Sequence, residues 1–387
     1  MNKKELELYI HIPFCVRKCS YCDFLSAPAT EQTREAYMAA LFAEIGGRAK
    51  DYSDRTVTSI FIGGGTPSLL SGEQIGQLMD RIREQFAMAQ DAEITMEVNP
   101  GTASAEKLRN FYTAGINRLS IGMQSAQAEE LKNLGRIHDF EGFCQVYREA
   151  VEAGFTNINV DVMSGLPGQT LASYRDTLEK VLHLEPMPQH ISAYSLIVEE
   201  GTPFAAMAER GELPLPEEET ERAMYEETIE VLAKYGFHRY EISNYARDGY
   251  ECRHNVGYWI RRDYLGFGIG AASLIDNVRF QNEKSLGAYL VHPLESREEE
   301  QTLTVQDRME ETMFLGLRLT RGVSCVDFAE QYGRTVEEVY GEVIARNVAD
   351  GLLTVTERKE NQKKDRFLAL TKRGLDLSNY VMAQFLF

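Results

Sequence analysis

Three cysteines lie within eight residues near the start of the chain: Cys15, Cys19 and Cys22. They follow a short apolar run, so a tight loop can bring the three thiols to one place. Clustered thiolates are typical ligands of soft metals and iron–sulfur centres, whereas structural zinc normally takes four protein ligands and no second cysteine pair lies nearby. Three thiolates can hold three irons of a [4Fe–4S] cube and leave the fourth open to an exogenous ligand. Three thiols that bind nothing are the less favoured interpretation, given this spacing.

Length and charge narrow the class of protein. With 387 residues, the chain is expected to form one domain of α/β-barrel size and a smaller one. A net charge of −18 argues against nucleic acid as the main partner. The six cysteines are too few and too unevenly placed for a disulfide framework, and an oxygen-sensitive cluster suits a reducing compartment, so we expect a cytoplasmic protein. We expect neither a signal peptide nor a membrane span, while peripheral contact with a membrane surface stays open.

Apolar, strand-like runs alternate with amphipathic helical ones over the first half of the chain. The expected strands are Leu6–Ile12, Val57–Ile62, Glu93–Val98, Arg118–Met123, Asn157–Val162 and Ile191–Val198. The expected helices are Glu35–Ile45, Glu73–Phe86, Ala105–Ala114, Phe140–Ala153 and Ser173–His183. Nearly continuous apolar strands, most of them followed by a helix, predict a parallel sheet buried on both faces. The pattern indicates an α/β fold, a TIM-like partial (α/β)6 barrel, whose chemistry lies beyond the carboxyl ends of its strands.

Further candidate site residues stand at these strand ends. The run Gly63–Pro67 lets backbone approach a ligand closely, although a plain tight turn is the alternative. Glu97 and Asp161 are carboxylates in otherwise apolar runs, where they are costly unless something pairs with them. They could grip an ammonium group or ribose hydroxyls, or else pair with structural arginines and backbone N–H groups. Arg136 is a candidate anion clamp, although a lone arginine more often lies on the surface.

Four motifs resemble those of the radical S-adenosylmethionine (SAM) superfamily and, within it, the oxygen-independent coproporphyrinogen III oxidase (HemN) family. The motifs span Tyr9–Cys22, Gly64–Pro67, Asn117–Gln124 and Asp161–Thr170, and the resemblance covers essentially the whole chain. It implies that Cys15, Cys19 and Cys22 hold a [4Fe–4S] cluster. It implies that Tyr9, Gly64 and Glu97 contact the SAM on that cluster. The positions that hold SAM, or a second SAM, in the oxidase correspond here to Tyr21, Gly65, Thr66, Gln124, Arg136 and Asp161.

One departure divides that family. The oxidases carry a fourth cysteine where this sequence has Phe24, and a later run, His254-Asn255-Val256-Gly257-Tyr258-Trp259, resembles the heme-chaperone branch. The resemblance implies a protein that binds heme and hands it to an acceptor protein whose identity the sequence does not give. It also implies that His254 binds heme, with Tyr258 and Trp259 beside the porphyrin; a hydrogen-bonded core histidine is the alternative. Oxidative decarboxylation of coproporphyrinogen III remains the alternative function, and we do not expect it.

The rest of the chain predicts two further units. The proposed divisions are a barrel over 1–200, an extension over 201–293 that carries His254, and a C-terminal domain over 294–387. Expected elements are a helix at Glu217–Tyr235, a strand at Tyr240–Tyr245, a linker at Leu294–Gln301, helices at Asp307–Leu317, Cys325–Tyr332 and Val336–Asp350, and a hairpin of Leu352–Thr356 with Arg366–Leu370 before a last helix. This order resembles a winged helix of the type that ends HemN-family chains. A DNA-binding regulator that senses redox state or SAM is disfavoured because acids slightly outnumber bases there, so we interpret the domain as a lid or docking module.

Overall fold

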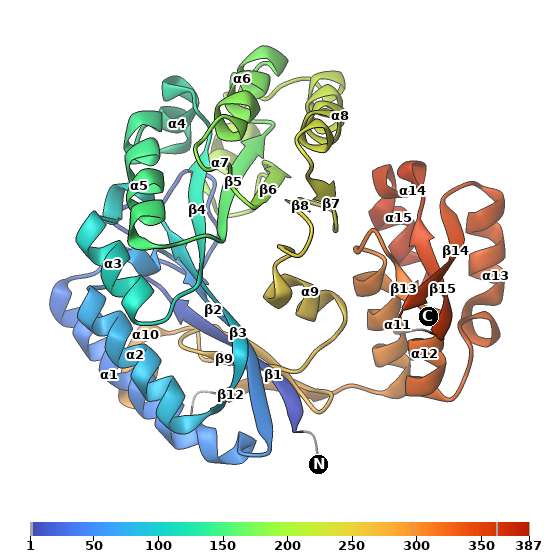
Figure 1. Ribbon diagram of the computed structural model, residues 1–387, viewed down its shortest axis with the longest axis horizontal. Coiled ribbons are helices and arrows are strands. Elements are labelled where there is room, and N and C mark those ends of the chain that lie inside the picture. The colour runs from blue at the N-terminus through green and yellow to red at the C-terminus, as the bar shows by residue number, and fades with distance from the viewer. Residues whose placement is uncertain (1–2, 296, 361–362, 387) are drawn as a thin grey trace.

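Six parallel strands form the centre of the fold (Figure 1). The structure, a computed structural model, describes residues 3–295, 297–360 and 363–386. The strands are β1 (Lys4–Ile12), β2 (Arg55–Gly64), β3 (Ala87–Val98), β4 (Arg118–Gln124), β5 (Ile158–Ser164) and β6 (His190–Ser195). They lie side by side in chain order, each parallel to the next. Their carboxyl ends therefore meet at one rim, where the cysteine loop follows β1.

Six helices cover the outer face of these strands (Figure 1). They are α1 (Glu31–Arg48), α2 (Gly72–Gln85), α3 (Ala105–Thr113), α4 (Ala128–Leu134), α5 (Phe140–Ala153) and α6 (Leu171–Leu182). The 3-10 turns between them are η1 (Ala49–Tyr52), η2 (Pro67–Leu69) and η3 (Pro100–Thr102). Hydroxyl caps start several helices: Thr30, Ser71 and Thr170 each accept a backbone N–H of the first turn. The apolar faces of strands and helices meet in one large core, as the continuous apolar strands predicted.

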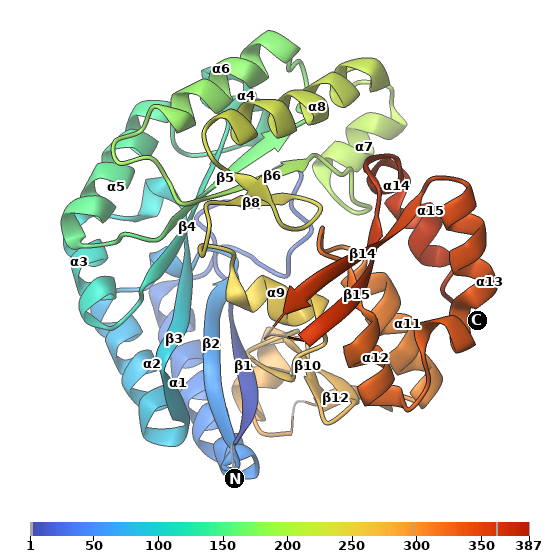
Figure 2. The same cartoon turned by 45° about the vertical axis from the view of Figure 1, so that its right-hand side comes forward.

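Shorter strands extend the sheet at both edges. Beyond β6 lie β8 (Asn244–Ala246) and β7 (His238–Arg239), and beyond β1 lie β9 (Tyr264–Phe267), β10 (Ala272–Ile275), β11 (Val278–Asn282) and β12 (Arg297–Thr302). The helices of this part are α7 (Pro203–Glu209), α8 (Glu218–Lys234), α9 (Arg253–Trp259) and α10 (Leu286–Val291). Helix α9 lies inside the curve of the sheet, between β2 and the C-terminal domain (Figure 2). The barrel interior is therefore partly filled by a segment that is distant in sequence.

The C-terminal domain has a core of its own, built around Met313, Phe328 and Leu368. Its elements are α11 (Val305–Gly316), β13 (Val323–Ser324), α12 (Cys325–Tyr332), α13 (Val336–Ala349), β14 (Leu353–Glu360), β15 (Lys363–Leu370), α14 (Lys372–Asp376) and α15 (Ser378–Ala383). Strands β14 and β15 form the predicted hairpin, and β13 joins it as a third strand. The α/β fold class, with a partial barrel, a sheet extension and a C-terminal domain, is confirmed. No helix in the described ranges is long and apolar enough to cross a membrane.

Two sequence-based assignments are wrong. The predicted linker Leu294–Gln301 includes most of strand β12, which pairs with β11; residue 296 lies outside the described ranges. Every side chain of β12 is exposed, so backbone pairing alone makes it a strand and no apolar pattern marks it. The single strand predicted at Tyr240–Tyr245 is wrong for residues 240–243, which form the turn between β7 and β8, whereas Asn244 and Tyr245 lie in β8. There the buried Glu241 side chain accepts from the backbone N–H of Ser243 and bends the chain.

Candidate functional site

A cavity of about 500 Å³ opens at the rim formed by the carboxyl ends of the strands. Polar side chains and backbone from every barrel strand except β1 line it, together with the loop after β1 and the extension. The predicted site residues in its wall are Cys15, Cys19, Tyr21, Cys22, Gly64, Gly65, Thr66, Glu97, Gln124, Arg136 and Asp161. Two predicted residues, Tyr9 and His254, are not in the wall. The strand order thus brings together most of what the motifs selected.

Backbone and side-chain hydrogen bonds hold the cysteine loop against the barrel. The Cys15 N–H donates to the Ala27 carbonyl at 3.2 Å, and the Ser20 N–H to the Leu134 carbonyl at 3.0 Å. All three thiols are free and only partly buried. The Thr66 hydroxyl donates to Cys15 Sγ at 3.4 Å. The loop therefore presents three accessible thiols to the cavity beside the glycine turn that follows β2.

Among the described residues, no three histidine, cysteine or acidic side chains are arranged to hold a single metal ion. A [4Fe–4S] cube needs a different geometry, because each thiolate binds its own iron and the sulfurs need not converge on one point. The Arg136 guanidinium lies 3.9 Å from Cys19 Sγ. A cation there suits a thiolate-ligated group. The three thiols fit a cluster and do not fit a single bound ion.

Glu97 is partly buried at the end of β3, and its carboxylate points to the glycine turn. The Gly64 N–H donates to its Oε2 at 3.0 Å. Burial, with a smaller contribution from nearby Asp161, raises the Glu97 pKa to about 8. Gly64 has a φ of +106°, and a Cβ there would lie 2.4 Å from the His11 ring, so only glycine fits this turn. An acid and a glycine turn thus share one corner of the cavity beside the cysteines.

Asp161 lies in β5, across the cavity from this corner. It accepts hydrogen bonds from Asn159 Nδ2 at 2.6 Å and Ser120 Oγ at 3.3 Å. Burial raises the pKa of Asp161 above its usual value, while these donors act in the opposite direction. Two partly buried carboxylates, Glu97 and Asp161, therefore face one cavity, and such a wall attracts a cationic ligand.

Arg136 and Gln124 complete the wall near the cysteines. Arg136 Nη2 donates to the Gly122 carbonyl at 2.6 Å, and its Nε has no partner within the described chain. The Tyr194 hydroxyl donates to Gln124 Oε1 at 3.0 Å, which fixes the amide of Gln124. Tyr21 packs beside the buried Leu134. Arg136 is thus a partly buried cation whose Nε–H has no acceptor in the described chain, which suits the predicted anion clamp better than a surface role does.

Tyr9 is held behind the cavity wall. Its hydroxyl lies 3.0 Å from His11 Nδ1, and its ring stacks on Phe61 with the ring centres 6.4 Å apart. Burial raises its pKa, so the phenol stays neutral. A contact between Tyr9 and a ligand therefore remains a prediction; the ring supports Phe61, which itself lines the cavity.

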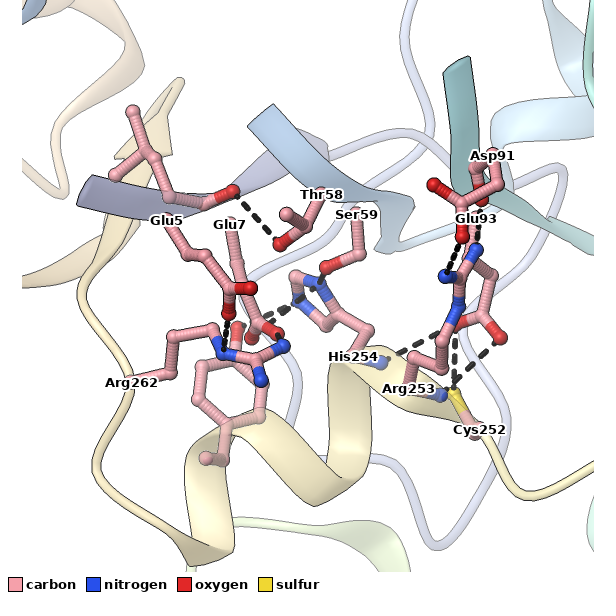
Figure 3. Close-up of polar contacts among 12 residues, drawn as sticks. Glu5, Glu7, Thr58, Ser59, Asp91, Glu93, Cys252, Arg253, His254 and Arg262 are labelled. Atoms are coloured by element: carbon pink, nitrogen blue, oxygen red, sulfur yellow. Dashed lines mark hydrogen bonds and ion pairs between the residues drawn. The ribbon is translucent and has the colours of Figure 1, made fainter. Parts of the chain in front are cut away.

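His254 lies one step deeper than Phe61, and its side chain is 1% exposed. Its Nδ1 lies 2.9 Å from Ser59 Oγ and its Nε2 lies 3.0 Å from the Tyr258 hydroxyl, so both ring nitrogens have partners (Figure 3). The ring stacks on Phe61 at 5.3 Å between centres. Burial lowers its pKa to about 3, which keeps the imidazole neutral. In this arrangement His254 is the hydrogen-bonded core residue that sequence reasoning offered as the alternative.

The aromatic neighbours of His254 do not flank the cavity as predicted. Tyr258 meets the His254 ring edge-on at 4.8 Å between centres. Trp259 turns the other way, and the Arg318 guanidinium lies 4.3 Å from its ring centre. Helix α9 therefore joins the barrel to the C-terminal domain, and a seven-residue helix cannot direct all of its aromatic side chains to one side.

The carboxylate of Glu7 lies between His254 and Arg262 (Figure 3), and Glu7 is fully buried. Arg262 Nη1 donates to its Oε1 at 3.2 Å. Its Oε2 has no hydrogen-bond donor in the described chain and lies 3.8 Å from the neutral His254 ring. Burial raises the Glu7 pKa to about 8 despite Arg262. Glu7 therefore makes folding dependent on pH.

Replacing Glu7 by glutamine is expected to remove that dependence. Since the folded pKa lies above the ordinary value of 4.5, the folded state keeps a proton that the unfolded state releases as the pH rises. This contribution to stability is present below about pH 5 and is lost towards pH 8, at up to about 1.4 kcal/mol per pH unit. Denaturant unfolding at several pH values should give a flatter profile for Glu7→Gln than for the parent. The exposed Glu5 supplies the control, Glu5→Gln, and equal slopes in parent and Glu7→Gln would contradict the assignment.

Sequence reasoning did not assign several cavity residues. They are Phe61, Arg118, Ser120, Asn159, Ser192, Tyr194, Asn244 and Asn255. Arg118 and Ser120 stood in a quoted motif without a role. Their alternate positions on β4 could have predicted that both face the barrel interior, because every second residue of a barrel strand does so.

Comparison with known proteins agrees with this architecture. The family model described as the Radical SAM superfamily matches residues 9–181, and that of the HemN C-terminal domain matches residues 303–377. A solved structure of coproporphyrinogen III oxidase (HemN) from Escherichia coli, titled a radical SAM enzyme, superposes with a TM-score of 0.84 at 28% identity, over 99% of this chain and 90% of that chain. The partial barrel and its three-cysteine loop therefore define a radical SAM protein.

Curated relatives identify the family within this superfamily. The heme chaperone HemW of Bacillus subtilis is 38% identical over 382 residues, which are 98% of this chain and 98% of the relative. The heme chaperone HemW of Escherichia coli is 37% identical over 358 residues, 90% of this chain and 92% of the relative. This chain belongs to the HemW family of heme chaperones.

Proposed function

We propose that the protein is a heme chaperone that carries a SAM-ligated [4Fe–4S] cluster, binds heme and transfers it to an acceptor protein. Cys15, Cys19 and Cys22 hold the cluster in this proposal, and Glu97 with the turn at Gly64 takes the SAM. The observation that carries it is the meeting of three free thiols, an acid and a glycine turn in one cavity of a HemW-family chain.

The charges of the cavity suit these cofactors. SAM bears an ammonium and a sulfonium group, and the carboxylates of Glu97 and Asp161 face the space beside the cysteines. A cluster held by three thiolates leaves one iron for the amino and carboxylate groups of SAM, and its reducing electron is the chemistry it supplies. The chain's own part is to place the two ligands next to each other, since Gly64 contacts Glu97 and Thr66 contacts Cys15.

For heme we propose His254 as an iron ligand, in an arrangement that differs from the one described. The imidazole is already neutral, as an iron ligand must be, but both nitrogens are hydrogen bonded. Freeing the ring breaks the contacts with Ser59 and Tyr258, at a net cost of about 1 kcal/mol each. Phe61 stacks on the ring and itself lines the cavity, so moving Phe61 would bring the ring closer to the cavity.

Anaerobic reconstitution followed by parallel assays of heme binding and coproporphyrinogen conversion tests the function. We expect a Soret band on heme titration and no product from coproporphyrinogen III, since Phe24 replaces the fourth cysteine of the oxidases and is 60% exposed. Robust protoporphyrinogen formation would instead establish the oxidase, and absence of any heme binding would refute the chaperone.

Variants around His254 separate a ligand from a core residue. We expect His254→Ala to weaken or shift the Soret band, because the imidazole is lost. The matched variants Ser59→Ala and Tyr258→Phe each remove one contact that restrains the ring, so they should bind heme as well as the parent or better. An unchanged band in His254→Ala, with a lower melting temperature in all three variants, would show that His254 is structural only.

A further inference from the structure

Arg118 lies at the inner end of the cavity, away from the cysteines. Arg118, Ser120 and Gly122 take alternate positions on β4, and all three line the cavity. Four residues of strand span roughly 13 Å, so Arg118 lies about that far below the level at which Arg136 binds Gly122. The cavity therefore has two cationic ends, one beside the cluster cysteines and one deep in the barrel.

The Arg118 guanidinium has almost no partners. It is 2% exposed, and within the described chain it donates one hydrogen bond, from Nη1 to Thr95 Oγ1 at 3.5 Å. Its Nε is buried without an acceptor, and among the described residues the acids Glu93 and Asp161 act on the guanidinium through their charge without a hydrogen bond. Burial disfavours this charge, and the groups that offset the cost, Glu93 and Asp161 among them, act from beyond ion-pair distance.

The acids near Arg118 form their hydrogen bonds with other groups. Glu93 and Asp161 act on it only at longer range. Glu93 accepts from the backbone N–H groups of Arg253 and His254, and Asp161 accepts from Asn159 and Ser120. The positive charge is thus left to face the cavity.

Asn255 offers a second donor in the same cavity. It belongs to α9, and its side-chain amide has no hydrogen-bond partner within the described ranges. It lies in the same short segment as Cys252, whose thiol is close enough to Arg118 to interact with it electrostatically. Arg118 lies on β4 and Asn255 on α9, so hydrogen-bond donors from two distant parts of the chain line the inner end of the cavity.

We propose that Arg118 and Asn255 form a carboxylate-binding subsite at the inner end of the cavity. The inference rests on the proposed function, because the carboxylate belongs to a ligand of the barrel: a propionate of heme, or the carboxylate of a second SAM molecule, since the first places its carboxylate on the cluster. A guanidinium binds a carboxylate through two parallel N–H donors, and a side-chain amide adds a third. The ligand then supplies the anion that the protein lacks at this position.

Titrations of the reconstituted protein with heme, heme dimethyl ester and SAM test the subsite. If it takes a propionate, the parent should bind heme about tenfold or more tightly than the ester, and Arg118→Met should bind the two alike. If it takes the SAM carboxylate, the parent should bind heme and ester alike while Arg118→Met weakens SAM by a similar factor. Arg118→Lys should keep part of either preference, because it keeps the charge.

Stability distinguishes a ligand site from a structural cation. Arg118→Met should melt close to the parent, because Arg118 forms no ion pair and its loss removes only longer-range attraction to Glu93 and Asp161. The control is Arg55→Met: Arg55 is equally buried but pairs with Asp263 and Asp276, so its loss should lower the melting temperature.

The outcomes that overturn the subsite are distinct from those that overturn the function. A ligand role for Arg118 is refuted if parent and Arg118→Met bind heme equally and also bind SAM equally, or if Arg118→Met fails to fold. In that case, the same titrations of Asn255→Ala show whether a preference for the carboxylate survives. A parent that binds no heme refutes the chaperone function, whereas its SAM titration still decides the subsite.

Discussion

Loss of the iron–sulfur absorption is the expected result of replacing Cys19 by serine in anaerobically reconstituted protein. Three thiols are available at the cavity, so each is expected to bind its own iron, and a serine hydroxyl is a poor substitute for a soft thiolate. Iron and sulfide analysis should give about one cluster per chain for the parent and close to none for Cys19→Ser. The loss should be nearly complete, because two thiolates leave half of the cube without protein ligands.

The remaining cysteines provide matched controls. Cys144 lies on α5 and Cys325 on α12, and neither lines the cavity. Cys144→Ser and Cys325→Ser should keep the parent's iron and sulfide content. A full cluster in Cys19→Ser, or its loss in a control, would show that the thiols at the rim are not the ligands.

The sequence was sufficient to predict the barrel because its strands are buried on both faces. Four of the six residues of Val57–Ile62 are apolar and none of the six is exposed, as a strand of a parallel sheet between two layers requires. Once the strands are in order, their carboxyl ends share one rim. The meeting of Cys15, Gly64 and Glu97 follows from that topology, and the cavity confirms their proximity.

The extension was harder to predict because its strands lack that pattern. Strand β12 has only exposed side chains, so its charged sequence predicted a linker. Strands β7 and β8 are too short for an alternating pattern, and a buried acid, Glu241, makes the turn between them. Pairing of such edge strands depends on the neighbouring strand, and a single sequence does not reveal that neighbour.

The deep part of the cavity could not be predicted at all. Helix α9 reaches the barrel interior from a segment far along the chain, and only the fold shows that His254 stacks behind Phe61. The missing partner of Arg118 is likewise a property of three-dimensional surroundings. A sequence shows that a charged residue is present, but it does not show which charges are left unpaired.

Loss of SAM binding is the expected result of two substitutions at the corner formed by β2 and β3. Glu97→Gln removes the partly buried carboxylate that faces the cavity, and Gly64→Val alters the turn that donates to it. A hydrogen bond to a charged group is worth about 1.5–3 kcal/mol, so each variant should bind SAM roughly tenfold to a hundredfold more weakly. The shift that SAM causes in the cluster spectrum, measured by anaerobic titration, reports this affinity.

The two variants act by different routes, and their controls differ accordingly. Gly64→Val forces a side chain into a backbone of φ +106° and against His11, so it should also lower the melting temperature, whereas Glu97→Gln should leave the turn in place. Gly76→Ala, on α2, places its Cβ in open space, so it should leave SAM affinity unchanged and melt no lower than the parent. The raised pKa of about 8 keeps the Glu97 carboxyl group largely protonated at neutral pH in the protein without ligand. Binding of a cationic group beside Glu97 favours loss of that proton. If Glu97→Gln and Gly64→Val both bind SAM as the parent does while Gly64→Val still melts lower, then the corner is structural and SAM is held elsewhere in the cavity.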